Sequence, residues 1–145
     1  MNGENNGGDF VDTNVLIYAY DIDAKAKHDI AVARIKQLWQ TKTGIISTQV
    51  LQEFYVNITR KIANPFSLTK AQTVLKRYLS WQVVTNTPEM ILLASEIQAR
   101  HLLSFWDALI IAAAQQGGAK TILTEDLNHG QLIEDIRIEN PFLSH

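Results

Sequence analysis

The sequence predicts an α/β fold in which helices cover a mainly parallel sheet of about five strands. Short segments rich in β-branched and apolar residues alternate along the chain with longer segments that carry apolar residues at helical spacing. A helix between two strands is the connection that parallel strands require, so the alternation indicates a doubly wound sheet. The length of 145 residues and the 46% content of hydrophobic residues suit one domain with a sizeable core.

The first half of the chain supplies two strands, each followed by helical sequence. The stretch FVDTNVLIYAY, Phe10 to Tyr20, predicts a buried strand over residues 9–12 that passes directly into a helix. A full helix follows from about His28 to Gln40, and GIIST at 44–48 is a β-branched strand. Residues 48–63 again carry apolar side chains at helical spacing.

The middle of the chain repeats this order. A helix is predicted to begin near Thr69, which has capping-box spacing with Gln72. WQVVT at 81–85 is the next strand. Thr87-Pro88 then provides an N-cap and a proline at the first helical position, for a helix that reaches about Arg100.

The last part of the chain holds one more helix and two strands. The helix runs from Ser104 to Gln116 and ends at Gly117-Gly118. A strand is predicted at 121–124, and a weaker one at 136–138.

The polar, glycine-rich start MNGENNGG, residues 1–8, predicts a disordered leader or a cloning remnant ahead of a single domain over residues 9–145. The longest apolar run, ALIIAAA, is much shorter than the roughly 20 residues that a membrane span needs. We therefore expect a cytoplasmic protein without membrane contact. The absence of cysteine excludes disulfides and thiolate metal sites, and leaves oxygen and imidazole ligands.

Four carboxylates are placed at strand ends and helix starts of the predicted sheet. In such sheets, ligands bind outside the carboxyl ends of the strands, where the strand order reverses. Asp12 ends the first strand and Asp126 follows the fourth, while Glu53 and Asp107 lie near the starts of two helices. We expect these four side chains to meet at one edge of the sheet.

Each carboxylate also has a structural interpretation. Asp12 suits the turn DTN, and Asp107 has capping-box spacing with Ser104. Glu53 lies away from the apolar stripe of its helix, and Asp126 lies in the loop TEDLNHG, so solvation or turn formation explains either one alone. The functional interpretation depends on all four together, and on Asp107 being the only charge in an apolar helix.

A ring of carboxylates without cysteine suits hard divalent cations such as Mg²⁺ or Mn²⁺. Without a cation, clustered carboxylates raise one another's pKa, so the cluster favours a bound ion. Such a site supports hydrolysis at phosphorus, in which metal ions activate water and neutralise developing charge.

The segments FVDTNVLIYAYD, LQEFY, SFWDALIIAAA, TEDLNHGQ and IRIENPF occur in an order that resembles the PIN-domain family, most closely the VapC-type ribonuclease toxins of toxin–antitoxin systems. The resemblance covers Asp9 to Phe142. It implies a three-layer α/β/α sandwich and a divalent-metal-dependent endoribonuclease. It further implies an RNA substrate, a cognate antitoxin and a homodimer.

The resemblance also assigns roles to residues. Asn14 and Ser104 match the positions that brace the first and third acids by hydrogen bonds. The acidic quartet that holds Mg²⁺ or Mn²⁺ and performs catalysis consists of Asp12, Glu53, Asp107 and Asp126.

Contacts with RNA and with partners are harder to place. Leaving out the four acids, basic side chains exceed acidic ones by two, so the net charge of −2 does not forbid a polyanion. Candidate phosphate contacts are Arg60 and Lys61, and also Lys76-Arg77 and Arg100-His101, although such pairs are usually solvated. His129 is better explained by a local hydrogen bond. Apolar residues expected to supply interfaces are Trp39, Tyr55, Phe66 and Trp81.

Two alternatives to the ribonuclease stay open. A phosphohydrolase of the haloacid-dehalogenase type, acting on a small substrate, needs D-x-D-x-[TV] after the first strand, where this chain has Asp12-Thr13-Asn14. A non-catalytic binding module with the PIN fold would be expected to lose one of the acids, and none is missing.

Overall fold

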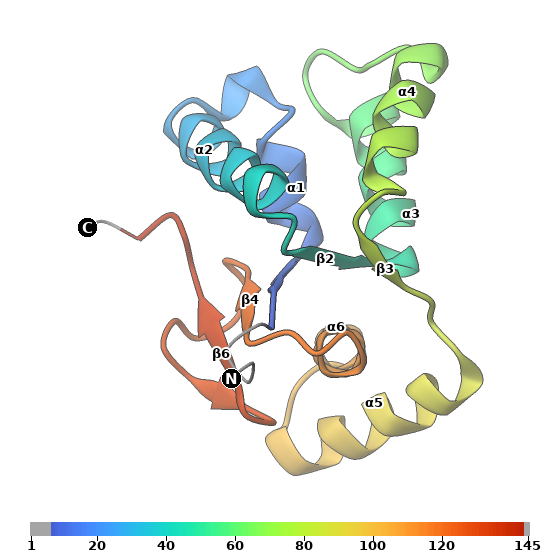
Figure 1. Cartoon of the computed structure of the whole chain (residues 1–145), viewed down its shortest axis with the longest axis vertical. Coiled ribbons are helices and arrows are strands. Elements are labelled where there is room, and N and C mark those ends of the chain that lie inside the picture. The colour runs from blue at the N-terminus through green and yellow to red at the C-terminus, as the bar shows by residue number, and fades with distance from the viewer. Residues whose placement is uncertain (1–6, 144–145) are drawn as a thin grey trace.

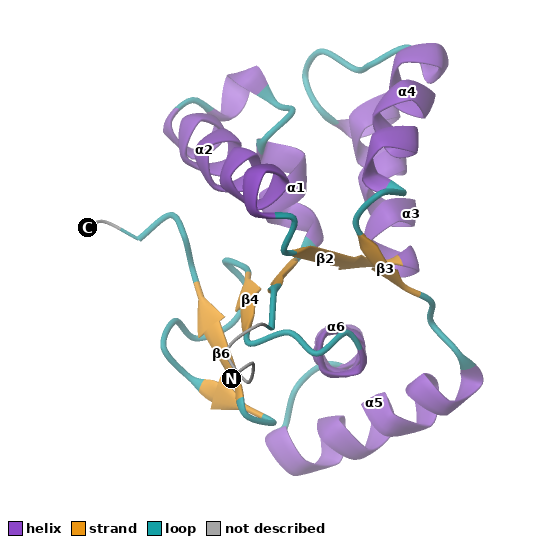
Figure 2. Ribbon diagram, in the orientation of Figure 1, coloured by secondary structure: helices purple, strands orange, loops and turns teal. Residues whose placement is uncertain are grey.

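The computed structural model describes residues 7–143, which form a six-stranded sheet in the order β3-β2-β1-β4-β6-β5. The pairs β3–β2, β2–β1, β1–β4 and β4–β6 are parallel, and β5 runs antiparallel to β6 (Figure 2). The prediction of a mainly parallel sheet is confirmed, with β5 as a strand that the sequence pattern missed. The strands are β1 (Asp9–Val11), β2 (Gly44–Ser47), β3 (Gln82–Val84), β4 (Thr121–Leu123), β5 (Leu132–Ile133) and β6 (Ile136–Glu139).

Helices lie on both sides of this sheet. Figure 1 shows α1 to α4 on one side and α5 with α6 on the other, which confirms the three-layer α/β/α sandwich. The α-helices are α1 (Thr13–Tyr18), α2 (Ala26–Thr41), α3 (Thr48–Val56), α4 (Leu68–Tyr78), α5 (Pro88–His101) and α6 (Phe105–Gln116), with a 3₁₀ turn η2 (Ile22–Ala24) and a π-helical turn η3 (Asn57–Lys61).

The α-helices of the described residues begin at side-chain caps, except α2, whose first residue follows Lys25 without such a cap. Thr87 caps α5 ahead of Pro88, as predicted, and Ser104 caps α6. The predicted helix start near Thr69 holds to within one residue, because α4 begins at Leu68. The cap is Ser67, whose hydroxyl accepts from the Lys70 N–H, and the capping role expected of Thr69 is wrong. The helical segment expected over 48–63 is α3 followed by η3.

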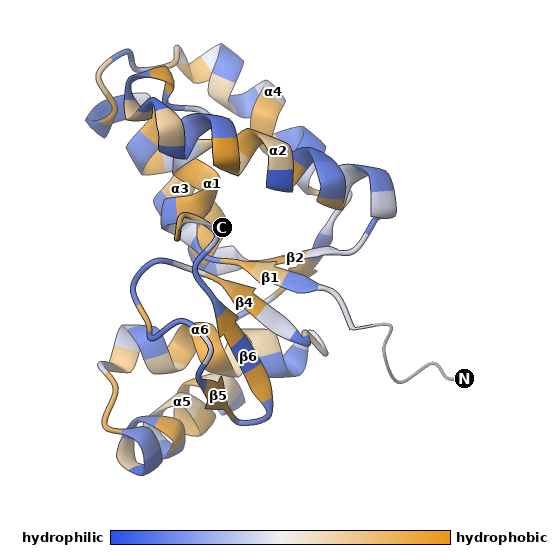
Figure 3. Ribbon diagram, turned by 90° about the vertical axis from the view of Figure 1, so that its left-hand side faces the viewer, coloured by the Kyte–Doolittle hydropathy of each residue, from blue (hydrophilic) through white to orange (hydrophobic). Residues whose placement is uncertain are grey.

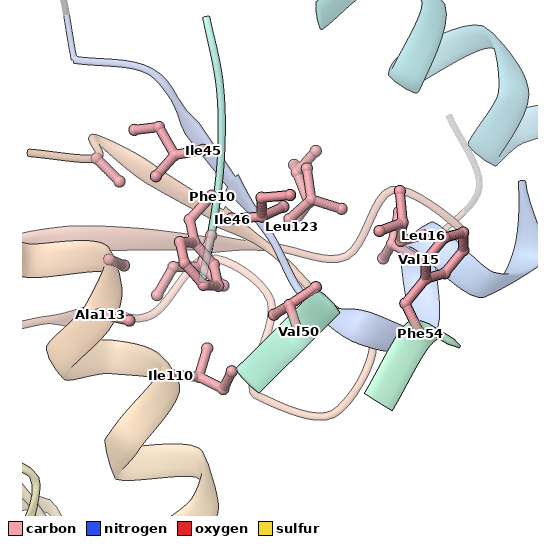
Figure 4. Close-up of a cluster of buried hydrophobic side chains, with 14 of the residues drawn as sticks. Phe10, Val15, Leu16, Ile45, Ile46, Val50, Phe54, Ile110, Ala113 and Leu123 are labelled. Carbon is pink, nitrogen blue, oxygen red and sulfur yellow. The ribbon is translucent and has the colours of Figure 1, made fainter. Parts of the chain in front are cut away.

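The core lies on both faces of the sheet. Figure 4 shows side chains from β1, β2, β4, α1, α3 and α6 gathered in one buried cluster, and Figure 3 shows hydrophobic residues concentrated along β1 and β2. The apolar run Ala108–Ala114 is buried at every position, so α6 is an internal helix between the sheet and α5. No helix within residues 7–143 combines the length and the apolar character that crossing a bilayer requires.

An aromatic cluster fills the space between α2, α4 and β3. Trp39 and Trp81 both pack against Tyr78, with ring centroids 5.1 and 5.0 Å from it. Trp81 is buried, and Trp39 is half-buried and packs against the core, so core packing accounts for much of the surface of both residues. Of the four residues expected at interfaces, Tyr55 lines a surface groove between α3 and α4, and Phe66 stacks edge-on against Tyr20.

The domain begins earlier than predicted. Most of the leader expected over residues 1–8 lies outside the described residues. Gly8 is buried, and its carbonyl accepts a 2.9 Å hydrogen bond from the Lys120 N–H. A Cβ at this position would meet the Thr43 carbonyl oxygen at 2.1 Å, so only glycine fits. Gly8 therefore belongs to the folded domain.

Candidate functional site

The candidate site lies where the strand order reverses. From β1 the chain builds the sheet outward through β2 and β3, and then returns to place β4 on the other side of β1. Asp12 directly follows β1 and Asp126 follows β4, while Glu53 comes from α3 and Asp107 from α6. All four carboxylates line one cavity of about 300 Å³. This position is the usual ligand site of an open parallel sheet.

Asp12 is held by two hydrogen bonds at the start of α1. Its carboxylate accepts from the Thr13 N–H at 2.7 Å and from the Thr124 hydroxyl at 2.8 Å. The residue is only 8% exposed. The pKa of Asp12 is raised to about 6. Burial is the largest cause, the two hydrogen bonds act against it, and the charges of Asp126 and Glu53 add to the rise. The turn chemistry expected of DTN is therefore present, and it places a buried carboxyl group at the cavity.

Glu53 and Asp126 are tied to the residues that follow β1. The Thr13 hydroxyl donates to Glu53 at 2.7 Å, so Glu53 has a specific partner although it is exposed. Asn14 Nδ2 donates to Asp126 at 2.7 Å. The expectation that Asn14 braces Asp12 by a hydrogen bond is therefore wrong, because the Asn14 amide donates to Asp126 instead. Burial and the charge of Asp107 raise the pKa of Asp126.

Asp107 stands at the third position of α6. Its backbone N–H donates to the Ser104 hydroxyl at 3.1 Å, so Ser104 braces the third acid through the backbone rather than through its carboxylate. Among the described residues, no side-chain hydrogen bond holds the Asp107 carboxylate, which leaves it free to act in the cavity.

Two amide oxygens add to the acidic cavity. Asn14 Oδ1 and Gln49 Oε1 are both buried, have no hydrogen-bond partner among the described residues, and belong to residues that line the cavity. Gln49 lies four residues before Glu53 on α3, so the two side chains are on the same face of the helix. This spacing could have identified Gln49 from the sequence. Unpartnered buried oxygens are unusual, and here they point to a ligand that donates hydrogen bonds or carries positive charge.

The donor set suits a hard divalent cation, because it consists only of carboxylate, amide and hydroxyl oxygens. Within residues 7–143, however, no three carboxylate or imidazole groups already surround a single point as metal ligands. The carboxylates are spread around the cavity. This arrangement fits an ion that keeps several waters, as Mg²⁺ does, with some acids acting through those waters.

The basic candidates lie outside this cavity. Arg60 and Lys61 end the π-helical turn η3, beyond Glu53 on the same segment. Arg100 and His101 both contact Glu134, and His129 accepts from the Asn140 N–H, the local bond expected of it. Three apolar residues that sequence reasoning did not assign complete the cavity lining: Ile17, Trp106 and Ile110.

Comparisons with known proteins agree with this fold. Residues 10–133 match the family described as PIN domain. Among solved structures, VapC20 of Mycobacterium tuberculosis, a sarcin–ricin loop cleaving toxin, superposes with a TM-score of 0.62 at 22% identity, covering 82% of this chain and 90% of that one. The DNA-bound VapBC of Salmonella typhimurium gives a TM-score of 0.64 at 20% identity, covering 93% and 98%. A search of curated proteins found no match.

Proposed function

This chain belongs to the PIN domain family, and from that premise we propose that it is a divalent-metal-dependent endoribonuclease that hydrolyses phosphodiester bonds of RNA. The observation that carries the proposal is the meeting of Asp12, Glu53, Asp107 and Asp126 in one cavity at the switch point of the sheet. A structural role explains each acid alone. It does not explain why four acids from four separate elements line the same small cavity.

Mg²⁺ or Mn²⁺ would be held among these four carboxylates, by some of them directly and by others through its waters. A bound ion would supply an activated water and neutralise charge on the phosphate. The chain's own residues prepare that site. Thr13 and Thr124 hold Asp12 and Glu53 in place, and Asn14 orients Asp126. Asp12 must be ionised to bind a cation, so its raised pKa makes the site dependent on pH near 6.

We also propose that the chain is the toxin of a toxin–antitoxin pair and forms a homodimer. The likeness in fold to a sarcin–ricin loop cleaving toxin and to VapBC supports this role. Induced expression should arrest growth, and Asp12→Asn should remove the arrest. Sedimentation of the purified chain at micromolar concentration tests the dimer, and a monomer would contradict it.

The central experiment incubates the purified chain with mixed cellular RNA in Mg²⁺ or Mn²⁺, and in parallel with a chelator. We expect cleavage with either ion and none with the chelator. Cleavage that persists with the chelator would count against a metal-dependent nuclease. Cleavage in none would favour a non-catalytic binding module, and release of phosphate from small phosphate esters without cleavage of RNA would favour a phosphohydrolase.

A further inference from the structure

The acidic cavity has an apolar part, which comes from the same helix as Asp107. Trp106 and Ile110 both line the cavity and stand one helical turn apart on α6. Ile110 is buried in the core, as Figure 4 shows, whereas Trp106 is 64% exposed. The carboxylate cluster therefore adjoins a large aromatic side chain that is open to solvent.

The exposure of Trp106 sets it apart from the other two tryptophans. Trp39 and Trp81 pack against each other and against Tyr78 in the aromatic cluster. Trp106 has one aromatic contact within residues 7–143, an edge-on arrangement with Phe105 at 5.4 Å. A single exposed apolar residue is ordinary on a protein surface. One that lines the candidate active site next to a carboxylate is placed to contact substrate.

We propose that Trp106 stacks on an unpaired base beside the scissile phosphate. This inference rests on the proposed ribonuclease function. A nucleotide joins a phosphate to a planar base, so a phosphate bound to a cation held among the carboxylates would bring a neighbouring base within reach of a side chain that lines the same cavity. Within a duplex, both faces of a base are covered by its neighbours, so only an unpaired base can stack on the indole.

A protein partner is the competing occupant, since Leu102, at the end of α5, is also highly exposed. Two features favour a base. The cavity that Trp106 lines is rich in carboxylate and amide oxygens, which suit a hydrated cation and the phosphate that such a cation would bind better than an apolar protein surface. Stacking on an aromatic side chain also requires no particular base, and so suits recognition of unpaired nucleotides in general.

The test is a double-mutant cycle between Trp106 and the substrate. The cleavage position in a short single-stranded oligoribonucleotide is mapped first, and the strand is then made with an abasic residue on either side of the cut. We expect Trp106→Ala to lower kcat/KM by about 5- to 150-fold on the intact strand, with little effect on the strand that lacks the stacked base. Trp106→Phe, which keeps an aromatic ring, should retain most of the rate. Annealing the complementary strand should suppress cleavage by the unaltered chain.

The controls separate stacking from loss of fold or of metal binding. Leu92→Ala removes another apolar side chain, which lies on α5 and is also 64% exposed. This variant should leave kcat/KM unchanged on the intact and the abasic strands. The melting temperature of Trp106→Ala, and its shift with Mn²⁺, should match those of the unaltered chain.

If Trp106→Ala lowers kcat/KM by the same factor on both abasic strands as on the intact strand, the assignment is overturned. It is also overturned if Trp106→Ala cleaves RNA normally but self-associates more weakly. If the unaltered chain cuts no RNA with either metal ion, the ribonuclease function itself fails, and the stacking role fails with it.

Discussion

The Thr124 hydroxyl donates a hydrogen bond of 2.8 Å to the carboxylate of Asp12, although the two residues are 112 positions apart in the chain. The same hydroxyl accepts from the Asp126 N–H at 3.1 Å. Thr124 is fully buried. One side chain at the end of β4 thus fixes both of the acids that follow the central strands.

Replacing Thr124 by valine should therefore disturb both acids without changing the volume of the core. The Asp12 carboxylate and the Asp126 N–H each lose a partner, so the free energy of unfolding without metal should fall by about 1–3 kcal/mol. The pKa of Asp12 should rise further, because the bond from Thr124 lowers it. Urea denaturation measures the first effect and the pH profile of RNA cleavage the second. Thr124→Ser keeps the hydroxyl and should keep the pH profile of cleavage, while losing about 1 kcal/mol of stability for its buried methyl group. Equal stability of the valine variant would show that the bond is unimportant.

Asp12→Asn and Asp107→Asn should each abolish metal-dependent cleavage while the fold stays as stable in chelator, or becomes more stable. Each change removes charge from a crowded acidic cavity, and asparagine can still cap α1 at position 12. Cleavage assays and thermal melts measure the two effects. Glu96→Gln, on the exposed face of α5, is the charge-matched control. If both variants lose several kcal/mol of stability, the two acids serve capping and turn formation instead.

The elements that could be predicted from the sequence are those that local interactions decide. The β-branched runs became β2 and β4, and Thr87-Pro88 begins α5, because a strand pattern and an N-cap depend on residues that are adjacent in the chain. β5 was missed because it has only two residues, and its hairpin with β6 turns at Glu134 and Asp135. Both turn residues have positive φ, where glycine or asparagine would have signalled the turn.

The parts of the site that could not be predicted depend on contacts between distant segments. Asp12 and Asp126 were identifiable because each follows a strand, and Asp107 because it opens a helix, whereas Glu53 lies in the second turn of α3 rather than at its start. Nothing local indicates that Asn14 reaches Asp126 rather than Asp12. Likewise Glu139 has the sequence context of a plain surface acid, yet Arg34 of α2 contacts its two carboxylate oxygens at 2.7 and 3.0 Å. Glu139 is therefore unsuitable as a neutral control for metal binding, whereas Glu96 is suitable.

Gln49→Leu should have opposite effects on the metal-free and the metal-bound protein. Gln49 is only 7% exposed and its Oε1 lacks a partner, so leucine should preserve or raise the melting temperature in chelator. If the amide oxygen contacts a cation or its waters, the rise in melting temperature with Mn²⁺ should become smaller. Gln52→Leu, on the face of α3 that lines the outer groove, is the matched control and should leave the metal effect unchanged. A normal metal effect in Gln49→Leu would remove this residue from the site.

The raised pKa of Asp12 should make the metal-free protein less stable as pH increases from about 4 to above 6. Burial raises this pKa from 3.8 in the unfolded chain to about 6 in the folded one. Between these values the folded state holds a proton that the unfolded state has released, so the stabilisation is fully present below the lower value and is lost as pH rises through the higher one. A shift of this size corresponds to about 3 kcal/mol.

Other groups titrate in the same range, so the measurement must isolate Asp12. The pKa values of Glu134 and Glu139 are lowered by their basic partners, and these acids lose their stabilisation as pH falls. The difference in free energy of unfolding between the unaltered chain and Asp12→Asn cancels their contributions. Urea denaturation in chelator at several pH values between 4 and 7.5 measures this difference. As pH rises, the free energy of unfolding of the unaltered chain should fall relative to that of the Asp12→Asn variant. Because a cation binds the ionised carboxylate, the gain in melting temperature with Mg²⁺ or Mn²⁺ should grow through the same pH window. A difference that stays constant with pH would mean that Asp12 is ionised over the whole range, and that burial does not raise its pKa.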